Sequence, residues 1–271
     1  MSLVQADFAQ TVERLVAEGL PRAKHPFTCR VLAGEASRQD LAIFAVQTYH
    51  RNLYSSRFAA ANFAHCPYLD VRRGLFEVIR EEELKDLGEP PSHAELMLRF
   101  AQALGMERED VINARPLPST LAFIDVIMQL SEGHWLEGLA FRASEIHAPR
   151  GSGMWRKALQ EHYGLSDEAV AWWSTHETAD VEHGNIALKG YGTYATDETS
   201  QQIAAHALQR MMAAWWVFWD GIEGAAQTAR QGHDVGFRLP SDPAASTGRK
   251  RNDEKHIPQV RQQLQNILAK K

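Results

Sequence analysis

His176, Asp180 and His183 could together form one face of a metal site. They stand at positions i, i+4 and i+7 of the segment HETADVEH, and an α-helix brings residues at these spacings to one side. Two imidazoles and a carboxylate suit first-row divalent metals, including ferrous iron that must meet dioxygen. The motif alone also fits two surface histidines that share a helix face with an acid.

The residues around this motif predict the helix that must carry it. Ser166 or Asp167 can cap its start, and neither proline nor glycine interrupts the segment before Gly184. A helix over 166–189 is therefore expected.

A second source of ligands is the acidic run at 81–83. Glu83 shares a helix side with Phe76 and Ile79 at spacings of three and four, and Glu82 lies slightly off that side. Asp86 follows within a turn. Solvation of the whole run is the alternative, because charged side chains are mostly exposed.

Further candidates are His93 and two glutamates in an apolar stretch. His93 follows Ser92, which can cap a helix, and Glu137 and Glu145 lie eight residues apart among large apolar residues. A buried carboxylate needs a cation or good hydrogen bonds. A metal would meet that need, and so would Arg142 if it formed an ion pair with one of these glutamates at the surface.

Together these segments supply six ligand-type side chains from four helical stretches. Helical bundles build di-iron and di-manganese carboxylate sites from inward-facing residues of this kind. The predicted metal ligands are Glu83, His93, Glu145, His176, Asp180 and His183.

Composition narrows the class of protein. The 271 residues are 44% hydrophobic with a formal charge of -5, which allows a large core and gives no basic field for nucleic acid. Two cysteines without a Cys-x-x-Cys pair favour a reducing cytoplasm. Neither a leader segment nor an apolar run of about 20 residues is recognisable, so a soluble protein without a membrane span is expected.

The apolar spacings of three and four predict an all-α fold. We expect one helical-bundle domain over 1–230, then a polar strap and a C-terminal helix over 231–271. The connectors are rich in proline and glycine, and 149–153 is one of them. The expected helices are 6–19, 37–64, 69–87, 92–105, 119–147, 152–163, 166–189, 197–230 and 258–269.

With these residues in view, the chain resembles the haem-oxygenase-like di-iron oxidases. It is also similar to pyrroloquinoline-quinone synthase and TenA, which share that fold. The resemblance covers most of residues 20–225. It is carried by His25-Pro26-Phe27, Cys66-Pro67, the 100–105 segment FAQALG, Ser144-Glu145 and the 180–184 segment DVEHG.

The resemblance implies a haem-oxygenase-like bundle of about seven core helices and two iron ions held by the six residues named above, although the same ligands accept manganese. The first carboxylate could also be Glu82 or Asp86, because the loop before His93 varies in length among such proteins. The implied activity is oxidation of a small organic substrate by dioxygen, and the fold allows a homodimer. Phe58 stands where the quinone synthase has a cation, which argues against the same substrate.

Two other hypotheses remain open. The first is a metal-free oxidase of a redox-active substrate, with His176 or His183 as acid and base. The second is a non-catalytic helical protein that binds a ligand or a partner. In an oxidase, the substrate cavity is expected to be lined by aromatic residues, with Glu137 as a further ligand or ligand support. The aromatic candidates are Tyr49, Tyr54, Phe58, Trp135 and Phe141.

Overall fold

The chain is all-α throughout residues 7–19, 22–83 and 91–240, which are the residues that the computed structural model describes, side chains of 22 and 178–182 excepted. A short 3-10 helix covers Arg22–Lys24. The α-helices are α1 (Phe8–Glu18), α2 (Pro26–Leu32), α3 (Arg38–Asn52), α4 (Ser55–His65), α5 (Leu69–Glu83), α6 (His93–Ala103), α7 (Arg108–Ile112), α8 (Pro118–Glu132), α9 (Trp135–Ala143), α10 (Ala148–Tyr163), α11 (Ala171–Tyr194) and α12 (Glu198–Arg230).

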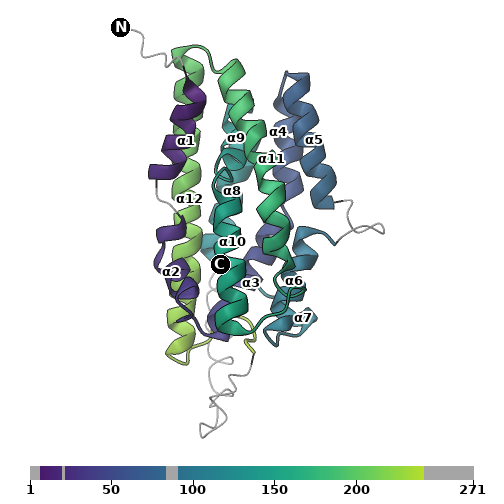
Figure 1. Cartoon of the computed structure of the whole chain (residues 1–271), viewed down its shortest axis with the longest axis vertical. Helices are drawn as coiled ribbons and strands as arrows, with labels where there is room; N and C mark the ends of the chain where they lie inside the picture. Colours follow the sequence, from purple (N-terminus) through teal and green to yellow (C-terminus); the bar gives the residue numbers. More distant parts are fainter. Residues whose placement is uncertain (1–6, 20–21, 84–90, 241–271) are drawn as a thin grey trace, which may run out of the picture. The chain divides into compact units, whose positions relative to one another are not determined.

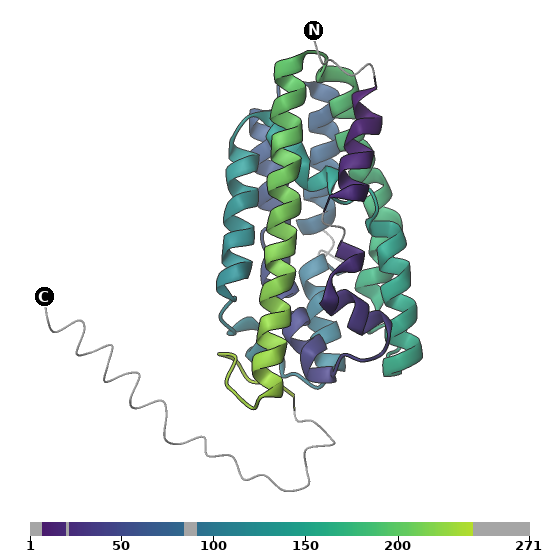
Figure 2. The ribbon, with the colours of Figure 1, turned by 90° about the vertical axis from the view of Figure 1, so that its left-hand side faces the viewer.

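The two longest helices, α11 and α12, run along the bundle formed by these residues (Figures 1 and 2). Helix α12 packs against α3, α8 and α9, and α11 packs against α5, α9 and α10. Helices α4 and α5 form an antiparallel pair, and α3 lies beside α6. This arrangement brings α5, α6, α9 and α11, the four segments expected to carry ligands, into one bundle.

Two of the long predicted helices are each divided in the structure. The predicted helix over 37–64 breaks at Leu53 and Tyr54 into α3 and α4. The predicted helix over 119–147 breaks at Gly133, where His134 starts α9 with a capping box: its ring accepts from a backbone N–H, and Glu137 accepts from the His134 N–H at 2.8 Å. Local capping overrides an apolar spacing that continues across the break.

Proline lies in the first turn of three helices. Pro26, Pro118 and Pro149 open α2, α8 and α10, where a missing N–H removes no helical hydrogen bond. The expected connector over 149–153 is therefore helical. The helices α2 and α7 were not predicted, and α11 begins at Ala171 rather than near 166.

The first compact unit of the chain extends from Met1 to Pro240. Residues of the predicted strap up to Pro240 pack on it: Val235, Phe237 and Leu239 lie against the core, and the Gln39 side chain donates to the Pro240 carbonyl at 3.0 Å. The predicted helix over 258–269 lies outside the described residues.

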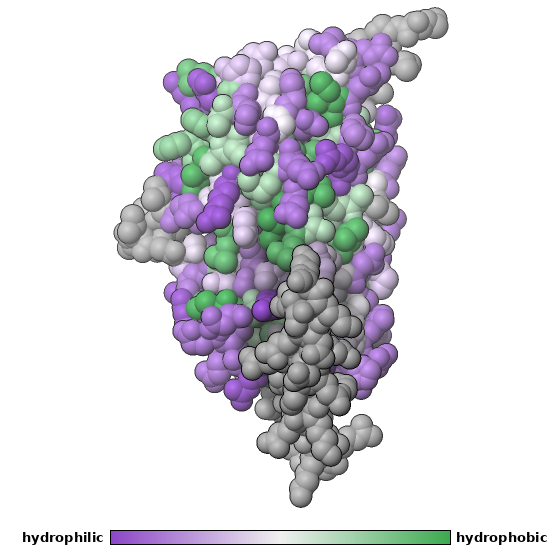
Figure 3. Space-filling model, turned by 180° about the vertical axis from the view of Figure 1, so that it is seen from behind, coloured by the Kyte–Doolittle hydropathy of each residue, from purple (hydrophilic) through white to green (hydrophobic). Residues whose placement is uncertain are grey.

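The surface and the core differ as expected for a globular bundle. Hydrophilic and apolar side chains are interspersed on the face seen in Figure 3, whereas the core is built from aliphatic and aromatic residues that include Phe27, Phe100, Phe123 and Phe218. Across the described ranges, every helix is too short or too polar to span a membrane. Against this apolar core, a buried group of acidic and histidine side chains stands out.

Candidate metal centre

Glu82 is the acidic residue that α5 turns into the bundle. The buried positions of this helix are Val71, Leu75 and Val78, and Glu82 continues their spacing of four, three and four. Its side chain is 7% exposed, and its Oε2 lies 3.0 Å from Nδ1 of His93. The helix thus places a carboxylate one turn beyond its last apolar core residue.

Glu83, the predicted ligand, lies on the outer side of the same helix. It is exposed and accepts a hydrogen bond from the Ser56 hydroxyl. Phe76, which shares its side, is 52% exposed. Glu83 is expected inside only if Phe76, on the same helix side, marks the buried face, and the exposure of Phe76 removes that reason. The structure brings Glu82 rather than Glu83 to His93, and Asp86 lies outside the described residues.

Glu81 also points toward the centre, which the sequence analysis did not foresee. Its Oε2 lies 3.0 Å from Nε2 of His183. Helix α5 therefore supplies two neighbouring carboxylates, each beside a different imidazole.

His93 opens α6 and is 2% exposed. Ser92 caps this helix by accepting from the Glu95 N–H, at 3.3 Å. The His93 ring lies 4.4 Å, between centroids, from the ring of His176. Its Nε2 is buried and has no hydrogen-bond partner within the described part of the chain. That nitrogen is suited to a ligand, because a buried polar atom without a partner is costly.

Glu145 lies in the turn between α9 and α10, and the cation beside it is Arg142. Arg142 donates from Nη1 to Glu145 Oε2 at 2.8 Å, and the same nitrogen lies 3.4 Å from His183 Nδ1. This arginine is 2% exposed, so the pair is buried and not at the surface. Glu137 lies elsewhere, since it caps the start of α9.

Helix α11 contributes His176 and His183, which are 7% and 2% exposed. The carbonyl of Trp172 lies 2.7 Å from Nδ1 of His176, and the Trp172 ring stacks on the His176 ring at 3.7 Å. Donation from Nδ1 to that carbonyl leaves the lone pair of the neutral ring on Nε2. Asp180 lies between them on α11, with its side chain outside the described residues.

We name these side chains the histidine cluster; its described members are Glu81, Glu82, His93, Arg142, Glu145, His176 and His183. Burial raises the pKa of Glu82, but attraction to His93, Arg142 and His176 outweighs burial and holds that pKa at about 2. Glu82 is therefore ionised at neutral pH. Ionised carboxylate and neutral imidazole are the forms that ligate a metal.

The donor set fits a divalent metal, although it is not arranged as a finished site. In the Glu82–His93 and Glu81–His183 pairs the carboxylate contacts the imidazole directly, at the hydrogen-bond distance of 3.0 Å. Glu82 contacts Nδ1 of His93, which leaves Nε2 of that ring for a ligand. As placed, no three acidic, histidine or cysteine side chains of the described part converge on one point. Arg142 lies between Glu145 and His183, and this arginine, rather than a metal ion, is paired with the Glu145 carboxylate.

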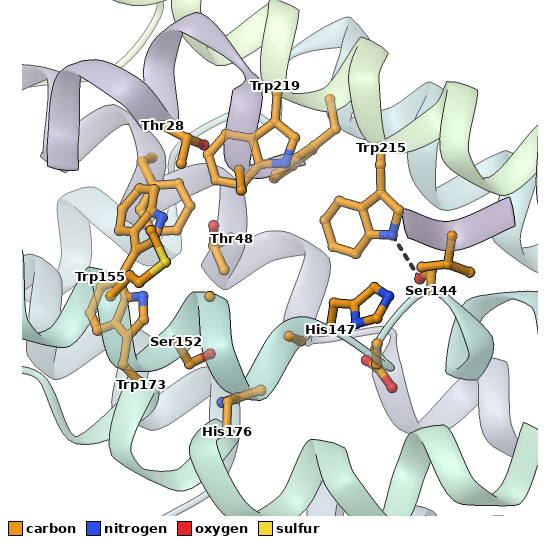
Figure 4. A pocket seen from close by; sticks show the side chains of 18 of the residues that line it. Thr28, Thr48, Ser144, His147, Ser152, Trp155, Trp173, His176, Trp215 and Trp219 are labelled. Carbon is orange, nitrogen blue, oxygen red and sulfur yellow. Dashed lines mark hydrogen bonds between the residues drawn. The ribbon is translucent and has the colours of Figure 1, made fainter. Parts of the chain in front are cut away.

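A cavity of about 190 Å³ adjoins the cluster, with Glu145 and His176 in its wall (Figure 4). None of the five aromatic residues expected to line such a cavity does so. Their place is taken by Phe44, Trp155, Trp172, Trp173, Trp215, Phe218 and Trp219. One signal was available in the sequence: Trp172 and Trp173 precede His176 by four and three residues, so a helix that points His176 inward also points them inward.

The chain has relatives in sequence and in structure. The chain is 26% identical over 224 residues to a 4-aminobenzoate synthase of Nitrosomonas europaea, covering 79% of this chain and 90% of that protein. It is 27% identical over 215 residues to a pyrroloquinoline-quinone synthase of Pseudomonas aeruginosa, covering 76% of this chain and 83% of that protein.

Solved structures share the fold. A protein of Shewanella denitrificans with a haem-oxygenase-like fold superposes with a TM-score of 0.70 at 19% identity, covering 83% of this chain and 94% of that one. A TenA homologue of Pseudomonas syringae gives 0.64 at 15% identity, with 80% and 93% covered. The expected haem-oxygenase-like fold is confirmed. The family described as iron-containing redox enzymes matches residues 42–216, more than half of the chain, and this protein therefore belongs to that family.

Proposed function

We propose that this protein is an iron-dependent oxidase or oxygenase that uses dioxygen to oxidise a small organic substrate. The observation that carries the proposal is the burial of Glu82, His93, Glu145, His176 and His183 in one cluster contributed by four segments. With Asp180 of the same helix face, they form a set of three carboxylates and three imidazoles that suits two iron ions. The proposed set keeps five of the six predicted ligands and replaces Glu83 by Glu82.

The chemistry supplied by bound iron is the activation of dioxygen, while the protein fixes the ligands and keeps the site dry. The Trp172 carbonyl orients His176 through Nδ1. Arg142 holds Glu145 in place and offsets its charge. The aromatic wall of the cavity excludes water beside the cluster. Family membership and the two synthases at 26% and 27% identity support an enzyme.

The proposal is tested by loading the full chain with ferrous iron without oxygen, measuring bound metal, and then following oxygen uptake. We expect about two iron ions per chain. His183→Ala should lose most of this iron, because His183 is a buried member of the cluster. His206→Ala is the matched control, since His206 is exposed on α12.

Absence of bound iron in the unmodified chain, together with oxidation of a substrate that chelation leaves unchanged, would refute the proposal. That result would favour metal-free oxidation with His176 or His183 as acid and base. Loading with manganese in place of iron distinguishes the two metals, because only the functional one should support oxygen uptake.

A further inference from the structure

The cavity beside the histidine cluster has the size of a single ring. An apolar cavity of roughly 150 Å³ in another protein admits benzene, and this one measures about 190 Å³. It therefore accommodates one six-membered ring with a short substituent. Larger ligands need movement of the aromatic wall.

The wall also has flat surfaces. Trp155 and Trp173 are nearly parallel, with an interplanar angle of 10° and ring centroids 5.8 Å apart, and Phe44 and Trp219 form a second parallel pair at 11° and 5.4 Å. Aromatic rings favour offset-stacked and edge-to-face contact with such surfaces. A flat, unsaturated ligand matches this wall better than a branched aliphatic one.

Four hydrogen-bonding atoms in this wall have no partner within the described residues: Nε1 of Trp172, Oγ1 of Thr28, Oγ1 of Thr48 and Nε1 of Trp219. The last three belong to residues that are 3%, 2% and 7% exposed and come from α2, α3 and α12. Threonine hydroxyls in helices commonly bond to a carbonyl one turn earlier, and these two do not. Buried polar groups nearly always have partners, so a ligand is the natural source of one here.

The chemistry of that partner follows from the donors. An indole N–H only donates, and a hydroxyl can donate as well, so the ligand must present a hydrogen-bond acceptor. Arg51 is the one arginine or lysine among the lining residues that the structure describes, and its guanidinium lies over Trp215 and donates to Asn52. An uncharged acceptor such as an amide, carbonyl or hydroxyl oxygen therefore suits the part of the cavity wall formed by Thr28 and Thr48.

We propose that the cavity binds a single-ring aromatic substrate whose uncharged acceptor group is held by Thr28, Thr48 and Trp219. In Figure 4 these three side chains lie around the part of the cavity away from Ser144 and His147. The ring then lies between the aromatic walls, and its opposite end faces Glu145 and His176. This substrate class deepens the proposed function and rests on it.

The test measures binding of benzamide, benzoate and benzene to the full chain without metal, by calorimetry and by tryptophan fluorescence. We expect benzamide to bind at least tenfold more tightly than benzene or benzoate. Thr48→Val should weaken benzamide binding about five- to tenfold and change the affinity for benzene by less than twofold. Thr48→Ser keeps the hydroxyl and should retain the affinity for benzamide.

Thr228→Val is the matched control, because the Thr228 hydroxyl donates a hydrogen bond to the Gly224 carbonyl of the same helix, α12. Thr228 is not part of the cavity wall. Equal binding of benzamide and benzene, tighter binding of benzoate, binding of none of them, or an equal effect of Thr48→Val on all ligands would overturn the inference. A chain that binds iron but none of these rings refutes this inference alone, whereas one that binds benzamide but no iron refutes the proposed function.

Discussion

Two groups of paired charges in this molecule are built on opposite principles. Near α2 and α12, Asp40 accepts from Arg30 at 2.8 Å and from Arg230 at 2.7 Å, and Glu223 accepts from the same two arginines at 2.7 Å and 3.2 Å. We call this group the arginine network. The histidine cluster instead contains three described glutamates, one arginine and three histidines.

The difference lies in what balances the carboxylates. In the arginine network two permanent cations match two acids, so the charges are compensated at any pH near neutrality. In the histidine cluster the acids exceed the permanent cations, and the remaining partners are imidazoles that are neutral or charged according to conditions. The first composition serves to stabilise the fold, and the second leaves a deficit of positive charge that a metal ion can fill.

The largest expected effect on stability is in the arginine network. Asp40→Asn should lower the free energy of unfolding by about 3 kcal/mol, since it removes the buried carboxylate that both arginines share. The guanidinium groups remain partly exposed, which keeps the loss at the low end of the range for such pairs. Denaturant titration measures the loss, and iron content should stay unchanged. Loss of iron in this variant would contradict the separation of the two groups.

Arg142→Met tests the opposite side of the comparison. Without metal, the free energy of unfolding of the variant should be about 2 kcal/mol lower, because the cation beside Glu145 is gone. The loss is limited because the imidazoles can partly replace that cation by taking up protons. Iron should raise the melting temperature of this variant by more than it raises that of the unmodified chain. An equal rise in both proteins would show that Arg142 does not balance charge at the metal centre.

A pH titration of stability separates Glu82 from its neighbours. The folded pKa of Glu82 is about 2, against 4.5 for the free side chain, so its contribution is complete above pH 4.5 and is lost as the pH falls toward 2. Between pH 4.5 and 3.5 this loss amounts to about 1 kcal/mol. Glu82→Gln should remove that part of the acid dependence in metal-free protein. An acid slope identical to that of the unmodified chain would exclude the depressed pKa.

Glu83→Gln is expected to have the smallest effect. Glu83 is exposed, and within the described residues it forms a hydrogen bond only with Ser56. The free energy of unfolding should therefore change by less than about 0.5 kcal/mol. Bound iron should stay at the level of the unmodified chain, whereas Glu82→Gln should lose it. The reverse order of the two variants would restore Glu83 as the ligand.

The sequence was sufficient for the all-α class and for placing His176 and His183 on one helix face, because periodicity along a helix determines which residues share a face. His93 and Glu145 are also buried, but it was the resemblance to di-iron oxidases that selected them. It was insufficient where two faces compete. Glu82 and Glu83 are both near the apolar stripe of α5, and the decision depended on whether Phe76 or Val78 marks the buried side. Exposure of Phe76 is a property of tertiary packing.

Helix boundaries and the cavity lining show the same limit. The capping box at His134 is a local signal inside a long apolar run. The prolines that open α2 and α10 were expected in connectors, because proline is common both in turns and in the first turn of a helix. The cavity wall depends on how α1, α2, α3, α10, α11 and α12 meet, so residues from six α-helices line it. Spacing within one helix can suggest Trp172 and Trp173, but it cannot pair Trp173 with Trp155 or Phe44 with Trp219.

The central claim is that iron binds in the histidine cluster with Glu82 as a ligand. Anomalous diffraction at the iron edge, from crystals of the full chain loaded with ferrous iron, tests it directly. The account predicts iron peaks roughly 2 Å from Glu82, His93, Glu145, His176 and His183. Peaks that coordinate Glu83 instead, or the absence of any iron peak within the cluster, would contradict it.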